Sequence, residues 1–333
     1  MSETMYVDDA TNLGKIKDIA KKILSDDYMR TMPEVDSRWP GRTQGFAVLV
    51  ADRVFSLSIV SQELIEKVVK PVLENTIVSR VMQGLHYQEY VGNDQQHKFL
   101  HSALVGAFNV AQANVRKSIS PDASPEYMTA LYHELQRLYV QGLMHDASFG
   151  FGLIPKSVLK NSESKLPDAV WEKVKKHPQH SLRLVRELGL EDQFGDQTAI
   201  AFHHEFSPDV DRRYPNLYAL GLSINQLQRE DATRLTISDN ISVNAEELIF
   251  GVKRPYVKNK PKTLDQIPAF ITRYLDTSFP LIEQSIESVV PIVVGAKPIV
   301  VERETEIHMT SPIGLLAAAC NLFGPNLLRN GRK

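Results

Sequence analysis

The sequence is poor in features that would place the protein outside the cell or in a membrane. Cys320 is the only cysteine among 333 residues, which excludes an intrachain disulfide and is typical of a reducing compartment. No apolar run approaches the roughly 20 residues that cross a bilayer, and the polar start of the chain does not resemble a secretory signal. A net charge of -2 gives no electrostatic reason to bind duplex nucleic acid or anionic lipid. These features predict a cytoplasmic protein.

The spacing of apolar residues predicts a mainly α-helical protein that begins with a small mixed α/β domain, residues 1–92. In this domain a basic amphipathic helix over 11–25 precedes a loop at 33–45 that is rich in proline and glycine. The stretch that follows, GFAVLVADRVFSL, is apolar and β-branched, which is typical of a strand or a pair of strands. The composition of this domain allows a sensor or a surface for a protein partner.

Residues 93–333 predict a helical domain with a C-terminal extension from about residue 262. Helical spacing dominates between residues 95 and 250. In the extension a helix is expected to lead into two β-branched runs around Gly295, which are typical of a hairpin.

Histidine and aspartate carry the chemistry of the second domain. Apolar residues surround His101 and His145 at helical spacing, so both side chains are expected to point inward. Imidazole and carboxylate ligands without thiolate favour Fe or Mn, with Zn as an alternative. Seven ligands exceed the number that one catalytic ion takes from a protein, which favours two ions, with Asp146 as the bridging carboxylate. The candidate ligands are His101, His145, Asp146, His177, His203, His204 and Asp239.

Each of these assignments has an ordinary alternative. A single histidine on an apolar face is more often a hydrogen-bonded core residue than a ligand. Adjacent histidines such as His203 and His204 are common by chance, and Asp239 also fits a helix cap or an exposed site. The remaining histidines are expected to be structural or exposed: His86, His133, His180 and His308.

Five segments around these residues stand in a fixed order along the chain. They are HSALV at 101–105, GLMHDASFGFGLIPKSVL at 142–159, LPDAVWEKVKKHPQHSLRLV at 166–185, AIAFHHEFSPDVDRRYP at 199–215 and TISDNISV at 236–243. Arg254-Pro255-Tyr256 follows them. Together they resemble the HD-GYP domain, a branch of the HD phosphohydrolase superfamily that hydrolyses the bacterial messenger cyclic di-GMP. The resemblance covers roughly residues 95–260.

The resemblance implies an all-helical, metal-dependent phosphohydrolase bundle with a binuclear site. It implies that Asp146 bridges the ions and that a metal-bound hydroxide attacks the phosphorus of cyclic di-GMP. Four residues are then expected near the substrate: Arg254 and Lys258 as phosphate contacts, Tyr214 at the rim of the pocket, and Arg213.

Several positions depart from the family pattern. The residues ASF at 147–149 stand where the family has IGK, so the lysine that is expected to meet substrate phosphate is missing, and Lys156 is near but not equivalent. Ser242 stands where some members carry a second acid and hold a third metal, which favours two ions here. His97 stands where those members carry a glutamate, which makes it an accessory candidate.

Three functions therefore stay open at the level of sequence. The first is a cyclic di-GMP phosphodiesterase. The second is a cyclic di-GMP sensor that keeps the metal site but has little turnover, which the missing lysine favours. The third is an HD-family hydrolase of another nucleotide phosphoester. We favour turnover because all seven ligands are retained, and a protein without metal chemistry has no use for so many buried polar groups.

Overall fold

The structure, a computed structural model, is mainly helical over the residues it describes, and none of those residues lies in a strand. The described residues are 10–32, 38–56, 61–90, 97–117, 123–155, 158, 167–206, 213–214, 223–250, 261, 263–273, 275–276 and 280–295. None of the helices within these ranges is both long and apolar enough to cross a bilayer. The mainly helical fold that the sequence predicts is thus confirmed.

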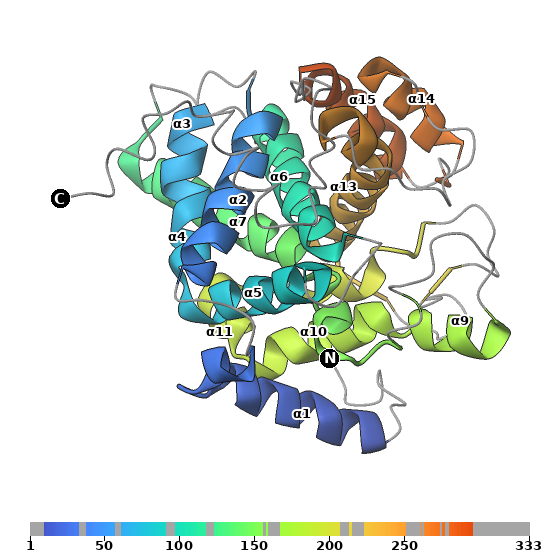
Figure 1. Cartoon of the computed structure of the whole chain (residues 1–333). Coiled ribbons are helices and arrows are strands. Elements are labelled where there is room, and N and C mark those ends of the chain that lie inside the picture. The colour runs from blue at the N-terminus through green and yellow to red at the C-terminus, as the bar shows by residue number, and fades with distance from the viewer. Residues whose placement is uncertain are drawn as a thin grey trace, which may run out of the picture.

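The helices follow one another along the chain as Figure 1 colours them. They are α1 (Ala10–Leu24), η2 (Tyr28–Thr31), α2 (Trp39–Val54), α3 (Ser61–Leu64), η3 (Ile65–Val69), α4 (Lys70–Glu74), α5 (Thr76–Tyr90), α6 (Lys98–Lys117), α7 (Pro125–Met144), η4 (Ala147–Phe151), α9 (Asp168–Val174), α10 (His177–Glu187), α11 (Leu190–Phe194), η5 (Thr198–Phe202), α13 (Gln226–Phe250), η7 (Leu264–Gln266), α14 (Ile267–Thr272) and α15 (Pro280–Gly295).

Helix α6 is the element on which the others converge. It packs against α2, α5, α7, α13 and α15 (Figure 1). Two buried amides fix its register: Asn109 donates to the Leu138 carbonyl of α7 at 2.7 Å, and Gln112 donates to the Ser238 hydroxyl of α13 at 2.6 Å. Because buried polar groups need partners, these bonds resist sliding of α6 along α7 or α13.

Two glycines allow α6 and α7 to come into backbone contact. A Cβ atom on Gly142 would lie 2.4 Å from the Cα of Gly106 and 2.6 Å from its nitrogen. Glycine is therefore required at 142 for a close approach rather than for a turn. The approach brings the end of α7, where His145 follows, toward His101 on α6.

The expected α/β character of the N-terminal domain is wrong. The helix predicted over 11–25 is confirmed as α1, but the proline-rich segment expected to be a loop contains the first turn of α2, where Pro40 loses no hydrogen bond. The apolar stretch expected to be a strand continues the same helix. Four of its buried apolar residues recur at the spacing of one helix face: Ala47, Val50, Ala51 and Val54. The domain boundary near residue 92 stays a prediction.

The hairpin expected around Gly295 is wrong in its first arm, which is the end of α15. Val289, Ile292 and Val293 are buried there, whereas Val290 is exposed, and this alternation follows a helical period. The second arm lies outside the described residues.

His86 on α5 joins the N-terminal helices to α6. Its ring lies between those of Trp39 and Phe99, with centroids 4.3 Å away on each side. Its Nδ1 lies 2.8 Å from the Thr43 hydroxyl. Burial lowers the pKa of His86 from 6.5 to about 4.

We expect Gly142→Ala to lower the free energy of unfolding by about 3 kcal/mol or more, because the added methyl group meets backbone that cannot turn aside. Gly45→Ala in α2 is the matched control. A Cβ there meets nothing within 4 Å, so removal of a helical glycine should raise stability by about 0.5–1 kcal/mol. Urea unfolding of both variants measures the difference, and equal effects would contradict the close approach.

The pKa of His86 also predicts a pH dependence of stability. Between pH 6.5 and about 4 the unfolded chain protonates this histidine while the folded protein does not, so the free energy of unfolding falls as the pH falls. We expect His86→Phe to reduce this slope by up to about 1.4 kcal/mol per pH unit. His133→Phe, at an exposed position, should leave the slope unchanged. Urea unfolding at a series of pH values tests both.

Candidate metal centre

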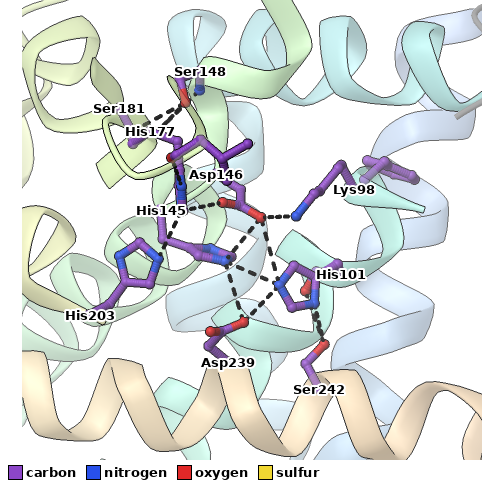
Figure 2. Close-up of polar contacts among 12 residues, drawn as sticks. Lys98, His101, His145, Asp146, Ser148, His177, Ser181, His203, Asp239 and Ser242 are labelled. Atoms are coloured by element: carbon purple, nitrogen blue, oxygen red, sulfur yellow. Dashed lines mark hydrogen bonds and ion pairs between the residues drawn. The ribbon is translucent and has the colours of Figure 1, made fainter. Parts of the chain in front are cut away.

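The structure brings all seven predicted ligands together, and we call these seven side chains the candidate metal centre. Figure 2 shows six of them directed toward one another. Those six are no more than 8% exposed, and His204 is half-buried. The seven residues come from five parts of the chain: His101 on the first turn of α6, His145 and Asp146 after α7, His177 at the start of α10, His203 and His204 after η5, and Asp239 on α13.

Asp146 lies between two groups of imidazoles. Its Oδ2 is 3.6 Å from the Nε2 of His145 and 3.8 Å from that of His101. Its Oδ1 is 3.2 Å from the Nε2 of His177. The donor atoms of His177, His203 and His204 lie within 4.8 Å of one another, and so do those of His101, His145 and Asp146. A carboxylate with one oxygen toward each group has the placement that a bridge between two ions requires.

Backbone carbonyls determine which nitrogen of three imidazoles faces the centre. The Nδ1 atoms of His145, His177 and His203 each donate to the carbonyl oxygen three residues earlier, at 2.7, 2.8 and 2.7 Å. A neutral imidazole carries one N–H, so the lone pair of each ring is on Nε2. All three rings thus present a metal-binding nitrogen to the centre, with the second nitrogen already bonded.

Burial keeps these imidazoles neutral. It lowers the pKa of His145 to about 4 and that of His177 to about 3, and it also lowers the pKa of His203 and His204. Neutral imidazole is the form that binds a metal ion, so no proton has to leave these four rings at neutral pH.

The two carboxylates of the centre are ionised. Burial would raise the pKa of Asp146, but the positive charge of Lys98 holds it well below its usual range. Burial likewise opposes ionisation of Asp239, and the hydrogen bond from His101 outweighs it and lowers the pKa of Asp239. The Oδ1 of Asp239 is 2.9 Å from the Nε2 of His101.

Hydrogen-bond acceptors therefore crowd together in a buried space. The Nε2 atoms of His177 and His203, whose Nδ1 atoms both donate to carbonyl oxygens, are 3.3 Å apart. Lone pairs this close repel one another beside two anionic carboxylates unless cations or shared protons lie among them. Imidazole with carboxylate, without thiolate, fits Fe, Mn or Zn better than Ca or Mg.

Glu246 is a member of the site that the sequence analysis did not identify. The Nδ1 of His101 lies 2.9 Å from the Ser242 hydroxyl and 3.1 Å from the Glu246 carboxylate, and Ser242 donates to Glu246 at 3.1 Å. A carboxylate behind a histidine orients the ring and strengthens it as a ligand. The spacing of Asp239, Ser242 and Glu246, at i, i+3 and i+7 on one helix face, was the available signal.

Hydrogen bonds of serine and threonine side chains link the segments that carry the ligands. The backbone N–H of Ser148 on η4 donates to the Ser181 hydroxyl of α10 at 3.1 Å, and the Ser148 hydroxyl donates to the His177 carbonyl at 3.2 Å. These bonds link the segment after Asp146 to the start of α10 (Figure 2). From the other side, the Thr236 hydroxyl donates to the His203 carbonyl at 2.7 Å.

The predicted substrate and accessory residues have different outcomes. Tyr214 stacks on His204, with ring centroids 4.5 Å apart. Arg213 forms an ion pair with Asp276, which a phosphate would have to displace. His97 bonds through Nδ1 to Glu89 of α5 at 3.1 Å. The other three lie outside the described residues: Lys156, Arg254 and Lys258.

Lys98 is a second member of the site that the sequence analysis did not identify. Its Nζ is 2.7 Å from the Oδ2 of Asp146. Nothing in the residues next to it marks it in the sequence, although its spacing from His101 places both on one face of α6.

Comparison with known proteins supplies no relative. No protein-family model, curated protein or solved structure matches this chain.

We expect Glu246→Gln to weaken metal binding by about 10- to 100-fold, because an amide supports the His101 ring less well than a carboxylate does. Glu187→Gln, at an exposed position on α10, is the control and should bind as the unchanged protein does. Competition with a chromogenic chelator measures the affinities for Mn and Zn. Equal affinities in all three proteins would remove Glu246 from the site.

Proposed function

We propose that this protein is a metal-dependent phosphodiesterase that hydrolyses cyclic di-GMP at a binuclear site formed by the candidate metal centre. The observation that carries the proposal is the position of Asp146, with one oxygen toward the imidazoles of His101 and His145 and the other toward His177. Fe is the first expectation for the metal, and Mn or Zn are alternatives.

The chemistry follows from such a site. When bound, two transition-metal ions supply a nucleophile from water at neutral pH and neutralise charge on a phosphoryl group. The task of the protein is to hold the ligands in one geometry. The carbonyl bonds to three Nδ1 atoms and the Glu246 carboxylate behind His101 do this before any substrate binds.

Aromatic residues beside the centre support a nucleotide as the substrate. The ring of Trp171 on α9 is 38% exposed and meets Tyr214 edge to face, with centroids 5.8 Å apart. Tyr214 in turn stacks on the ligand His204. Bases stack on aromatic rings with little dependence on sequence, so Trp171 offers a nucleobase a ring near the candidate metal centre. The order of the five sequence segments favours cyclic di-GMP among nucleotides.

The proposal is tested on the full-length protein purified with Fe or Mn. We expect about two metal ions per chain by elemental analysis, and linear or mononucleotide products from cyclic di-GMP by chromatography. Protein without metal would overturn the proposal. Tight binding of cyclic di-GMP without cleavage would support the sensor instead. Cleavage of bis(p-nitrophenyl) phosphate without an effect on cyclic di-GMP would support a hydrolase of another phosphoester.

We expect Asp146→Asn to lose at least one metal ion per chain and all detectable turnover, because an amide offers one oxygen and cannot bridge two ions. Asp192→Asn, which alters an exposed carboxylate on α11, should keep the full metal content and the full turnover. Metal content and hydrolysis are measured on the same preparations. An Asp146→Asn protein with the full metal content would show that Asp146 is not a bridging ligand.

A further inference from the structure

The ammonium group of Lys98 lies inside the candidate metal centre. Its Nζ is 2.7 Å from the Oδ2 of Asp146, the oxygen on the His101 and His145 side, and its side chain is 12% exposed. Among the lysines and arginines in the described ranges, Lys98 is the one that pairs with a carboxylate of the centre. Figure 2 shows it reaching Asp146 from α6.

A second contact holds the same ammonium group. Lys98 Nζ lies over the ring of Phe149, 4.3 Å from its centroid, an arrangement that attracts a cation to the ring face. Phe149 is on η4, three residues after Asp146, and its own ring packs against that of His177 at 5.0 Å. The cation is thus held between the bridging carboxylate and a buried aromatic ring, close to both groups of imidazoles.

The start of α6 is built to present Lys98 in this direction. The residue before it, His97, has φ of 50°, and it is the one residue other than glycine with positive φ in the described ranges. Glu89 of α5 holds this strained turn: it bonds to the His97 ring at 3.1 Å and accepts from the N–H groups of Phe99 and Leu100 at 3.1 and 3.2 Å. A strained backbone conformation that neighbouring hydrogen bonds maintain, as Glu89 does here, is common at functional sites.

We propose that Lys98 is the phosphate-binding cation of this site and contacts a non-bridging oxygen of the substrate phosphate. The inference rests on the proposed function, because it takes the metal-bound phosphate as the partner of Lys98. Lys98 then supplies from α6 the positive charge that the segment at 147–149 does not carry. The contact with Asp146 need not be lost, because an ammonium group has three donors and a carboxylate has about four lone-pair positions.

The chemistry of the group fits this role. Lysine is a compact cation that can turn toward an oxygen of phosphate while its stem stays packed. In this chain the ammonium group lies over Phe149 and the side chain is 12% exposed, so little side-chain freedom is left to lose on binding. Arg213, the cation among the predicted substrate residues that the structure describes, is instead engaged with Asp276.

The test uses the full-length protein loaded with Mn and inorganic phosphate as the probe. Metal content, phosphate affinity by calorimetry and hydrolysis of cyclic di-GMP are measured for Lys98→Met, for Lys98→Arg, and for Lys15→Met at an exposed position on α1 as the control. We expect Lys98→Met to keep its metal, to bind phosphate about 10- to 100-fold more weakly, and to turn over about 10²- to 10³-fold more slowly. Lys98→Arg should recover most of the phosphate affinity, and the control should match the unchanged protein.

Unchanged phosphate affinity in metal-loaded Lys98→Met would overturn the inference and leave Lys98 as a counterion of Asp146. Failure of the unchanged, metal-loaded protein to bind phosphate would overturn it as well. Failure of the proposed function is a separate result: the unchanged protein would then cleave no phosphodiester, while phosphate binding would still depend on Lys98.

Phe149→Leu provides a second variant if Lys98→Met does not fold. It removes the ring face beneath the ammonium group and keeps the charge. We expect full metal content and a several-fold loss of phosphate affinity. Unaltered phosphate affinity in Phe149→Leu would contradict the inference that Phe149 positions Lys98 for phosphate.

Discussion

Burying two ionised carboxylates beside neutral imidazoles costs several kcal/mol per charge unless each group is bonded or paired. In the candidate metal centre, surrounding residues provide these hydrogen bonds. The Nδ1 atoms of His145, His177 and His203 are bonded to carbonyl oxygens, and that of His101 lies against Ser242 and Glu246. The Nε2 atoms of His145, His177 and His203 and the Asp146 carboxylate face inward, and a cation among them would satisfy these acceptors. The packing of these helices and the arrangement of the candidate ligands therefore depend on the same hydrogen bonds.

Six of the seven candidate ligands lie at a helix end or within one turn of it, and Asp239 lies in the middle of α13. This arrangement explains how distant segments meet at one point. His145 follows α7, His177 opens α10 and His203 follows η5, so the chain can change direction beside each ligand. Long helices then set the distances between these points. The pairing of α6 with α7 and α13 through buried amides keeps His101 and Asp239 in register with the helix ends.

The residues at motif positions were predictable from the sequence because their types and order are unusual, and all seven meet in the structure. The residues behind them were harder to find. Glu246 is recognised as part of the site only when its place on the face of α13 that carries Asp239 is known. Lys98 is recognised only from the three-dimensional path of η4, which brings Phe149 beneath its ammonium group. The strand assigned to the stretch in α2 failed because β-branched residues favour strands only weakly, and burial on α6 decides their conformation. Pro40 looked like a breaker but stands in a first turn, where proline is tolerated.

Gly142 serves the packing and the chemistry at once. Its missing side chain lets α6 and α7 touch, and its carbonyl oxygen accepts the Nδ1–H of His145. A shift of the backbone at Gly142 would change the contact between α6 and α7 and would also rotate the ring of His145. Evolution thus has little room to change the stability of this helix pair independently of the candidate metal centre: variants that relax the contact would also alter how His145 is oriented, and selection on either property acts on both.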